Sequence, residues 1–164
     1  MGMMMRVLFL CTGNSCRSQM AEGLLRWLGG SVVEVVSAGT DPRPVHPDAV
    51  RAMREIGLDI SRQKSKSAEP FFAQRFDYVI TLCDAARESC PVFPGAAKTA
   101  HWSLPDPAAA IGSEEQRLQV FRSVRDQLAA RIDDLLAEMM EGFLGKWSEM
   151  ADPSQVEAPS KDSI

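Results

Sequence analysis

The chain has 164 residues, and its apolar fraction of 45% and charged fraction of 24% are those of an ordinary single globular domain. A net charge of −4 argues against a nucleic-acid binder that relies on a broad basic surface. The sequence has no apolar run near the length of a membrane span, and its start lacks the apolar stretch of a secretory signal. We therefore expect a cytoplasmic protein that binds neither nucleic acid nor membrane.

The first third of the chain alternates strand and helix patterns. Residues 6–10 (RVLFL) predict a buried strand, and a helix follows that ends at Gly29-Gly30. Residues 31–36 (SVVEVV) predict a second strand. The next segment, HPDAVRAMREIGL, predicts a helix that starts at Pro47 with His46 as its cap and stops at Gly57. The apolar face of the first helix is expected to comprise Met20, Leu24, Leu25 and Leu28.

The rest of the chain continues this alternation. Residues 78–82 (YVITL) and 98–102 (KTAHW) predict a third and a fourth strand, and the sequence from Ser113 to Gln116 matches a capping box at the start of a long helix. We expect residues 1–145 to form a single domain and the polar residues 146–164 to form a disordered tail. The core face of the long helix is expected to comprise Leu118, Phe121, Val124, Leu128, Ile132, Leu135 and Met139.

Strands that alternate with helices predict an α/β fold with three layers, in which a four-stranded parallel sheet is flanked by helices. Ligands bind at the carboxyl ends of the strands in such folds. Three chemically distinctive side chains fall at this edge: Cys11 ends the first strand, Cys83 ends the third, and Asp106 lies just past the fourth. We therefore expect these three residues to share one site.

The stretch CTGNSCRS begins at Cys11 and connects the first strand to the first helix. A loop in this place presents backbone N–H groups and the positive end of a helix dipole to one point, so it can wrap a tetrahedral oxyanion. Gly13 permits a positive φ and Asn14 tolerates one. Arg17 offers a planar fork to the anion, and Ser18 can donate to the Cys11 thiolate that this positive field favours. The expected oxyanion-binding residues are Thr12, Gly13, Asn14, Ser15, Cys16 and Arg17.

The cysteines allow two other interpretations. Cys11 and Cys16 could ligate zinc together with Cys83 and Cys90, although the C-x4-C and C-x6-C spacings are looser than those of most structural zinc pairs. Cys11 could also be a buried, inert cysteine. A non-catalytic anion sensor is a further alternative, but it would need neither an acid at Asp106 nor the pair Cys83 and Cys90. Cys16 has no evident role of its own in the loop.

The motif CTGNSCRS, with the later Asp106-Pro107, resembles the low-molecular-weight protein tyrosine phosphatase fold, in which the phosphatase loop joins the first strand to the first helix. The segments TLCDAARESCP and HWSLPDP narrow the resemblance to the thioredoxin-coupled arsenate reductases built on that fold, over about residues 5–140. The resemblance implies an arsenical-detoxification enzyme without a cofactor. It further implies arsenate as substrate, phosphate or sulfate as mimics, and thioredoxin as electron donor. We expect a monomer.

The resemblance also implies a redox-active relay of three cysteines. Cys11 attacks arsenate that is held by the loop and Arg17, while Asp106 acts as general acid. Cys83 then attacks Cys11, and two electrons pass to arsenic. Finally Cys90 attacks Cys83, and thioredoxin reduces the resulting disulfide by thiol–disulfide exchange.

The spacing of the last two cysteines has a geometric consequence. Cys83 and Cys90 are seven positions apart, which in a helix is about 10.5 Å. A disulfide tolerates a Cα separation of at most about 7 Å. If this segment is helical when reduced, it must unwind to oxidise, and we expect a redox-driven rearrangement of residues 83–97.

The alternative function is that of a low-molecular-weight phosphatase acting on phosphate esters or phosphotyrosine. Phosphatases of this family usually carry tyrosine after the Asp-Pro pair, whereas alanines follow Asp106-Pro107 here and Tyr78 is the only tyrosine. This argues against a tyrosyl substrate. Weak activity on small phosphate esters is expected, because arsenate and phosphate share shape and charge. Glutaredoxin with glutathione, or another small thiol, stays open as the electron donor.

Some members of the family carry a potassium site near the loop, and Asn14, Glu22 and Ser37 match its positions. Other ligands would follow later in the chain, where Lys64 and Lys66 stand in place of a Thr and an Asp of the family pattern. A lysine ammonium near Glu22 could replace the ion, or both lysines could be solvated surface charges. We expect no metal and no dependence on potassium.

Overall fold

The computed structural model describes residues 4–83 and 93–150. The chain divides into two compact units, Met1–Ile132 and Asp133–Ile164, and every strand among the described residues belongs to the first. The strands are β1 (Met5–Cys11), β2 (Val33–Gly39), β3 (Phe76–Thr81) and β4 (Ala96–His101). The α-helices are α1 (Arg17–Gly29), α2 (Pro47–Arg54) and α4 (Glu114–Met150), and the 3-10 helices are η1 (Gly30–Val32), η2 (Glu69–Phe71) and η3 (Pro107–Ala109).

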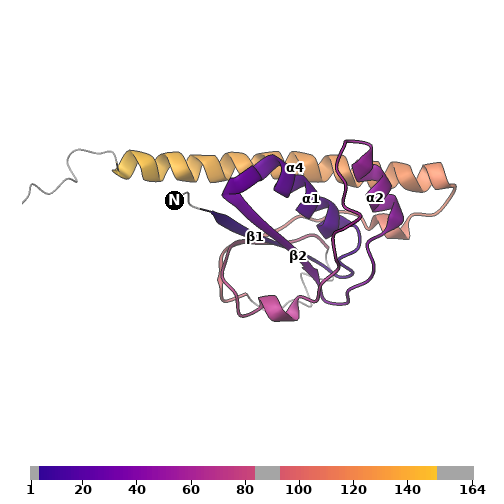
Figure 1. The fold of residues 1–164 in the computed structure, drawn as a ribbon, viewed down its shortest axis with the longest axis horizontal. Helices are drawn as coiled ribbons and strands as arrows, with labels where there is room; N and C mark the ends of the chain where they lie inside the picture. Colours follow the sequence, from indigo (N-terminus) through magenta and orange to yellow (C-terminus); the bar gives the residue numbers. More distant parts are fainter. Residues whose placement is uncertain (1–3, 84–92, 151–164) are drawn as a thin grey trace, which may run out of the picture. The chain divides into compact units, whose positions relative to one another are not determined.

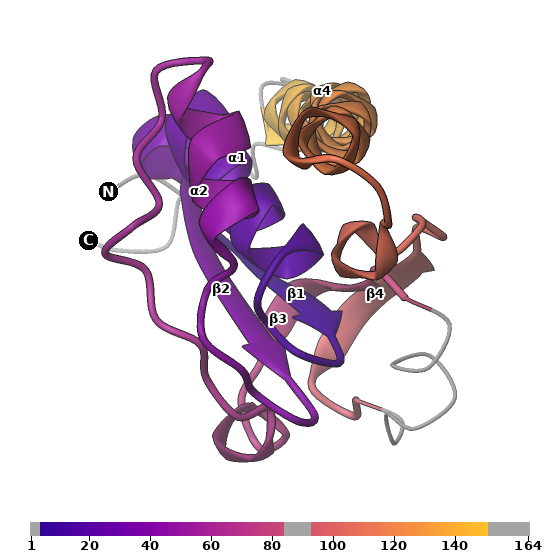
Figure 2. The same cartoon turned by 90° about the vertical axis from the view of Figure 1, so that its right-hand side faces the viewer.

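The four strands form one parallel sheet in the order β2-β1-β3-β4. Figure 2 shows the sheet with α1 and α2 over the same face. This arrangement confirms the predicted α/β fold with a four-stranded parallel sheet flanked by helices. All carboxyl ends meet at one edge, where Cys11 is in register with Gly39 and Leu10 with Thr81.

Strand β1 is buried on both faces, as expected for a central strand of a covered parallel sheet. On one face, Leu8 and Leu10 pack in a cluster with Phe76 and Phe93, and the segment that contains η2 covers this cluster. On the other face lies Phe9, fully buried, whose ring is 5.8 Å from that of Trp102. The apolar run RVLFL thus fixes the strand whose carboxyl end carries Cys11.

Several predicted helix signals are confirmed. The His46 ring nitrogen accepts a hydrogen bond from the backbone N–H of Asp48 at 3.1 Å, and Gly57 has φ of 83°. The capping box holds in both directions, because the Gln116 N–H donates to Ser113 Oγ at 3.2 Å and the Ser113 N–H donates to Gln116 Oε1 at 2.9 Å. All seven positions of the predicted core face of α4 are buried.

Two local predictions were wrong. Leu28 is 38% exposed, because the last turn of α1 faces β2 through Gly29, whose missing side chain makes room for Val33. The second strand begins at Val33 rather than at Ser31, since residues 30–32 form η1. Figure 1 shows β2 next to β1, with which it pairs.

Three predictions fall on residues 84–92 or 151–164, which lie outside the described residues. They concern Cys90, the redox-driven rearrangement and the end of the tail. The predicted domain boundary near residue 145 stays a prediction. No helix within the described part of the chain is long and apolar enough to cross a bilayer.

Candidate active site

The loop from Cys11 to Arg17 is shaped by the chain segment that follows β2. Four of its carbonyl groups accept hydrogen bonds from backbone N–H groups of residues 40–46, which draws those carbonyls to the outside of the loop. Because peptide units are planar, the N–H groups that follow these carbonyls face the opposite way, toward the loop centre. The pairs are Thr40 to Cys11 at 3.4 Å, Asp41 to Thr12 at 2.9 Å, Arg43 to Gly13 at 2.8 Å and His46 to Ser15 at 2.9 Å.

The Cys11 sulfur is buried and surrounded by hydrogen-bond donors. Its Sγ accepts the backbone N–H of Asn14 at 3.1 Å and lies 2.9 Å from Ser18 Oγ. The Ser18 oxygen itself accepts from Asn14 Nδ2 at 2.8 Å, so the serine hydroxyl hydrogen is directed to the sulfur. The thiolate is the nucleophilic form of cysteine, and both donors are placed to hydrogen-bond to that sulfur. Ser18 Oγ therefore lies where it can hydrogen-bond to the Cys11 sulfur.

The Asn14 side chain makes hydrogen bonds that connect the loop to its surroundings. It is fully buried and has φ of 46°, the only positive φ among the non-glycine residues that the structure describes. The left-handed residue of the loop is therefore Asn14 and not Gly13. Its Nδ2 donates to Ser37 Oγ at 2.9 Å as well as to Ser18, and its Oδ1 accepts the backbone N–H of Lys66 at 2.8 Å. These hydrogen bonds offset the energetic cost of the left-handed backbone at Asn14 and stabilise this conformation of the loop.

Three residues that support the loop were not predicted from the sequence. Ser65 Oγ and Gln19 Nε2 both donate to the Asn14 carbonyl, at 2.7 and 2.9 Å. Gly39 lies against the loop so closely that an added Cβ would stand 2.4 Å from the Thr12 carbonyl oxygen and 2.9 Å from the Asn14 nitrogen. Gly39 is in register with Cys11, Gln19 lies in the first turn of α1, and Ser65 is near the bridge between Gly39 and Ser67. No local motif marks these residues.

Arg17 and Asp106 lie together at the mouth of the loop. The Arg17 side chain is 11% exposed, and its Nη1 donates to the Leu104 carbonyl at 3.0 Å. Its Nη2 lies 3.8 Å from Asp106 Oδ1, whose side chain is half exposed. The same Oδ1 accepts the backbone N–H of Ala108 at 3.0 Å and so caps η3. Arg17 is thus held at the mouth of the loop, and Asp106 lies beside it, open to solvent.

Cys83 reaches the loop from the neighbouring strand. It lies just beyond the end of β3, is 5% exposed, and its Sγ is 3.4 Å from Thr12 Oγ1. The structure therefore brings together all three residues expected at this edge: Cys11, Asp106 and Cys83. Arg17, which was also predicted to be catalytic, lies beside Asp106 at the same edge.

Cys16 occupies the last position of the loop before α1 and is 3% exposed. Burial away from water raises the pKa of its thiol from the ordinary 9.0 to about 12, while Ser15, Asp106, Cys11 and Arg17 contribute smaller effects. A thiol with this pKa stays protonated at neutral pH and is a poor nucleophile and metal ligand. Within the described part of the chain, no three His, Cys, Asp or Glu side chains converge as metal ligands.

The potassium candidates Asn14 and Ser37 lie 2.9 Å apart, but the amide nitrogen of Asn14, rather than its oxygen, faces Ser37. Glu22 is buried in α1, where its Oε1 accepts from Arg26 Nη2 at 3.0 Å and lies 3.9 Å from Lys66 Nζ. Two side-chain cations of the chain thus already face this carboxylate.

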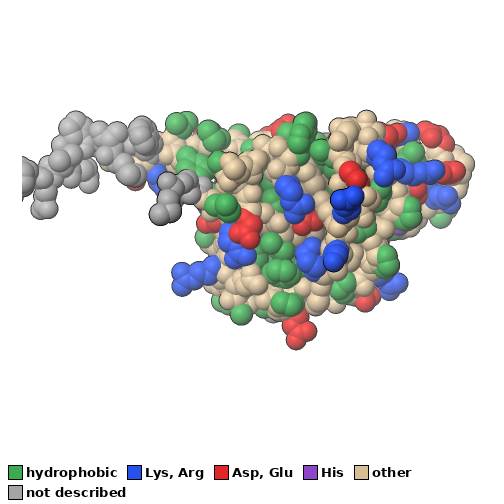
Figure 3. All heavy atoms as spheres, viewed as in Figure 1, with side chains coloured by type: hydrophobic (Ala, Val, Ile, Leu, Met, Phe, Trp, Pro, Cys, Tyr) green, Lys and Arg blue, Asp and Glu red, His purple; other side chains and the backbone are tan. Residues whose placement is uncertain are grey.

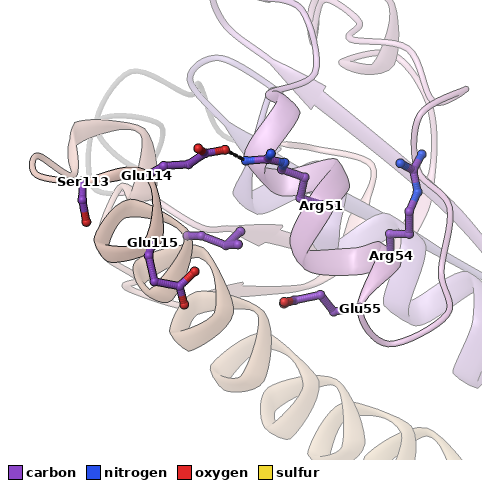
Figure 4. Close-up of a pocket in the computed structure, with 7 residues that line it drawn as sticks. Arg51, Arg54, Glu55, Ser113, Glu114 and Glu115 are labelled. Carbon is purple, nitrogen blue, oxygen red and sulfur yellow. Dashed lines mark hydrogen bonds and ion pairs between the residues drawn. The ribbon is translucent and has the colours of Figure 1, made fainter.

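A pocket of about 640 Å³ lies between α2 and the start of α4 (Figure 4). In Figure 4 the Arg51 side chain extends from α2 to the carboxylate of Glu114. Arg122 of α4 forms a two-pronged pair with Glu55, with its Nε at 2.9 Å and its Nη2 at 2.7 Å from the carboxylate oxygens. These ion pairs join α2 and the residue after it to the start of α4.

The arrangement at the strand ends can hold a tetrahedral oxyanion, attack it with Cys11, supply a proton from Asp106 and present Cys83 as a second nucleophile.

The family model described as low molecular weight phosphotyrosine protein phosphatase matches residues 6–143 of the chain. An arsenate reductase from Halalkalibacterium halodurans is 48% identical over 126 residues, which is 77% of this chain and 91% of the relative.

Solved structures agree with this likeness. An arsenate reductase in the phosphate-binding state is 41% identical, with a TM-score of 0.72 over 82% of this chain and 98% of that chain. A thioredoxin-dependent arsenate reductase from Corynebacterium glutamicum is 30% identical, with a TM-score of 0.66 over 85% of this chain and 64% of that chain.

Proposed function

This chain belongs to the low-molecular-weight phosphotyrosine protein phosphatase family, among its arsenate reductases, and we propose that it reduces arsenate to arsenite by a relay of three cysteines that thioredoxin resets. The observation that carries the proposal is the position of Cys83, whose sulfur lies 3.4 Å from Thr12 Oγ1 of the anion loop. Hydrolysis of a phosphate ester needs one cysteine, whereas a second cysteine beside the loop serves a redox step.

The first step forms a bond between Cys11 Sγ and arsenic. The loop N–H groups and Arg17 hold the arsenate oxygens, so that the anion is oriented before the thiolate attacks. One oxygen leaves as water after Asp106 supplies a proton, in line with its place 3.8 Å from Arg17 Nη2. The product is a covalent adduct in which arsenic is still in its +5 state.

The second step is the redox step. The Cys83 thiolate attacks Cys11 Sγ, a Cys11–Cys83 disulfide forms, and the sulfur–arsenic bond breaks. Its electron pair stays on arsenic, which is reduced to the +3 state and leaves as arsenite. Cys90 then attacks Cys83 and releases the Cys11 thiolate. Two thiols have been oxidised to one disulfide, which balances the two electrons that arsenic gained.

The Cys83–Cys90 disulfide needs a dithiol reductant from outside the chain, and we propose thioredoxin in the cytoplasm, where thiols are kept reduced. The thioredoxin-dependent relative supports this choice. A side activity on small phosphate esters is expected, since the loop and Asp106 would serve both anions.

The test is arsenate-dependent NADPH oxidation with thioredoxin and thioredoxin reductase, with the wild type beside Cys90→Ser. We expect steady turnover of the wild type and at most one turnover of the variant. Gly142→Ala, where an added Cβ meets nothing within 4 Å, is the control, and it should keep turning over.

Turnover with glutaredoxin and glutathione in place of thioredoxin would keep the reductase and replace its reductant. Brisk hydrolysis of a phosphate ester without arsenate reduction by any donor would refute the relay.

A further inference from the structure

Glu22 carries a charge that is buried behind the anion loop. Its side chain is 5% exposed, and its Oε2 has no hydrogen-bond partner among the described residues. The other oxygen, Oε1, accepts from Arg26 Nη2 at 3.0 Å and lies 3.9 Å from Lys66 Nζ. A buried carboxylate with an unsatisfied oxygen is costly unless a cation compensates it.

Lys66 links this carboxylate to the loop. Its backbone N–H donates to Asn14 Oδ1 at 2.8 Å, and its carbonyl accepts the N–H of Gly39 at 2.9 Å. Its ammonium group donates to the Lys64 carbonyl at 2.8 Å. The main chain of Lys66 therefore supports the left-handed residue of the loop, while its side chain faces Glu22.

The surroundings do not suit the potassium ion that some members of the family carry near the loop. The amide oxygen of Asn14 is occupied by the N–H of Lys66, and its nitrogen faces Ser37. The pocket beside Glu22, about 420 Å³, has four basic side chains and two acidic ones, and this excess of positive charge repels a cation. Figure 3 shows basic side chains gathered over α1 on this face. The lining comprises Glu22, Arg26, Asp59, Arg62, Gln63, Lys64 and Lys66.

We propose that Lys66, together with Arg26, is the built-in counter-cation of Glu22, so that the anion loop is held in shape without a bound alkali metal ion. Lys66 is then a positioning residue, which acts on the site through Asn14. A lysine suits this role because its compact ammonium moves on a flexible stem and can serve either carboxylate oxygen. The proposal goes beyond the reduction of arsenate and stands independently of the cysteine relay.

The test measures thermal unfolding in potassium chloride and in sodium chloride at equal ionic strength. We expect the Tm of the wild type to be the same in both salts. Lys66→Met removes the charge and keeps the length of the side chain, and it should lower Tm by about 3–6 °C in sodium. Lys66→Asp should lower Tm in sodium by more than Lys66→Met does. Its Tm should also rise with potassium until the effect saturates, because two carboxylates then lie together without a counter-cation.

Lys64→Met is the matched control, since Lys64 lines the same pocket and the described residues give its ammonium no ion pair with Glu22. It should leave Tm unchanged. Phosphate affinity, measured by calorimetry, should fall in Lys66→Met and stay constant in Lys64→Met. A wild-type Tm that rises with potassium but not with sodium would overturn the proposal, and so would a Lys66→Met chain as stable as the wild type.

Discussion

Thr12 Oγ1 and Cys83 Sγ lie 3.4 Å apart, across the carboxyl ends of the neighbouring strands β1 and β3. Thr12 is the first residue of the loop after Cys11, so one hydroxyl joins the loop to the second cysteine. In the proposed relay, Cys83 becomes a nucleophile after the adduct has formed. A hydroxyl that donates to its sulfur stabilises the thiolate and positions it toward the loop.

Thr12→Val should slow the redox step without weakening arsenate binding. The change keeps the shape of the side chain and removes the donor to Cys83. A hydrogen bond to a charged group contributes about 1.5–3 kcal/mol, so kcat should fall about 10- to 100-fold while KM stays nearly constant. Steady-state assays with thioredoxin in excess measure both constants. Thr12→Ser keeps the hydroxyl and should recover most of kcat, and a Thr12→Val enzyme with unchanged kcat would contradict this role.

Gly39→Ala should disrupt the anion loop from the adjacent strand. The new Cβ would meet backbone atoms of Thr12 and Asn14 at 2.4 and 2.9 Å, so the loop itself must move. We expect phosphate and arsenate affinity to fall at least about tenfold, as for the loss of about 1.4 kcal/mol. Isothermal titration measures the affinity directly.

Gly142→Ala is the control for this change, because an added Cβ there meets nothing within 4 Å. It should leave anion affinity unchanged and stabilise α4 by about 0.5–1 kcal/mol. Equal anion binding by the Gly39→Ala and wild-type proteins would show that the close approach does not shape the loop.

Asn14→Ala should destabilise the whole protein as well as the site. It removes a side chain that makes hydrogen bonds to Ser18, Ser37 and the backbone of Lys66, and it leaves a residue less tolerant of φ of 46°. We expect a loss of about 2–4 kcal/mol in the free energy of unfolding, measured by urea titration. Ser37→Ala deletes one of these partners and should cost about 1 kcal/mol. Equal losses in the two variants would argue against a central role for Asn14.

Cys16 should resist alkylation at neutral pH, because burial raises the pKa of its thiol to about 12. Iodoacetamide at pH 7.5 should modify Cys11 before Cys16, as judged by peptide mass spectrometry. Rapid labelling of Cys16 in the folded protein would contradict this order.

The same raised pKa predicts a loss of stability in alkali. The unfolded chain loses the Cys16 proton from about pH 9.0, whereas the folded chain keeps it up to about pH 12. The unfolded state therefore binds fewer protons in this window, and the free energy of unfolding falls as the pH rises through it. In Cys16→Ala this alkaline decline should be shallower, and pH-dependent urea titrations of the two proteins measure the difference.

Much of the fold was predictable from local patterns. The run RVLFL, the capping box at Ser113 and the glycine after α2 each determine their own segment, and the alternation of strands and helices indicates a parallel sheet. The meeting of Cys11, Cys83 and Asp106 follows from that topology, since parallel strands end at one edge. The exposure of Leu28 was missed because it depends on how Gly29 packs against Val33.

The second layer of the site could not be predicted in the same way. Ser65 and Gly39 support the loop from segments far from it in the sequence, whereas Gln19 supports it from the first turn of α1. These residue types are common on any surface or strand. The sequence allowed a left-handed backbone at either Gly13 or Asn14. The buried hydrogen-bond partners of Asn14 select that residue, and they contribute more than the conformational freedom of a glycine.

The central claim is that arsenic receives its two electrons from Cys11 and Cys83, and that Cys90 completes the disulfide. The most direct measurement is peptide mass spectrometry after the reduced protein reacts with one equivalent of arsenate and no reductant. We predict one arsenite per chain, with a Cys83–Cys90 disulfide in the wild type and a Cys11–Cys83 disulfide in Cys90→Ser. Arsenite formation with Cys83 still a free thiol, or with a disulfide that excludes Cys83, would contradict the account.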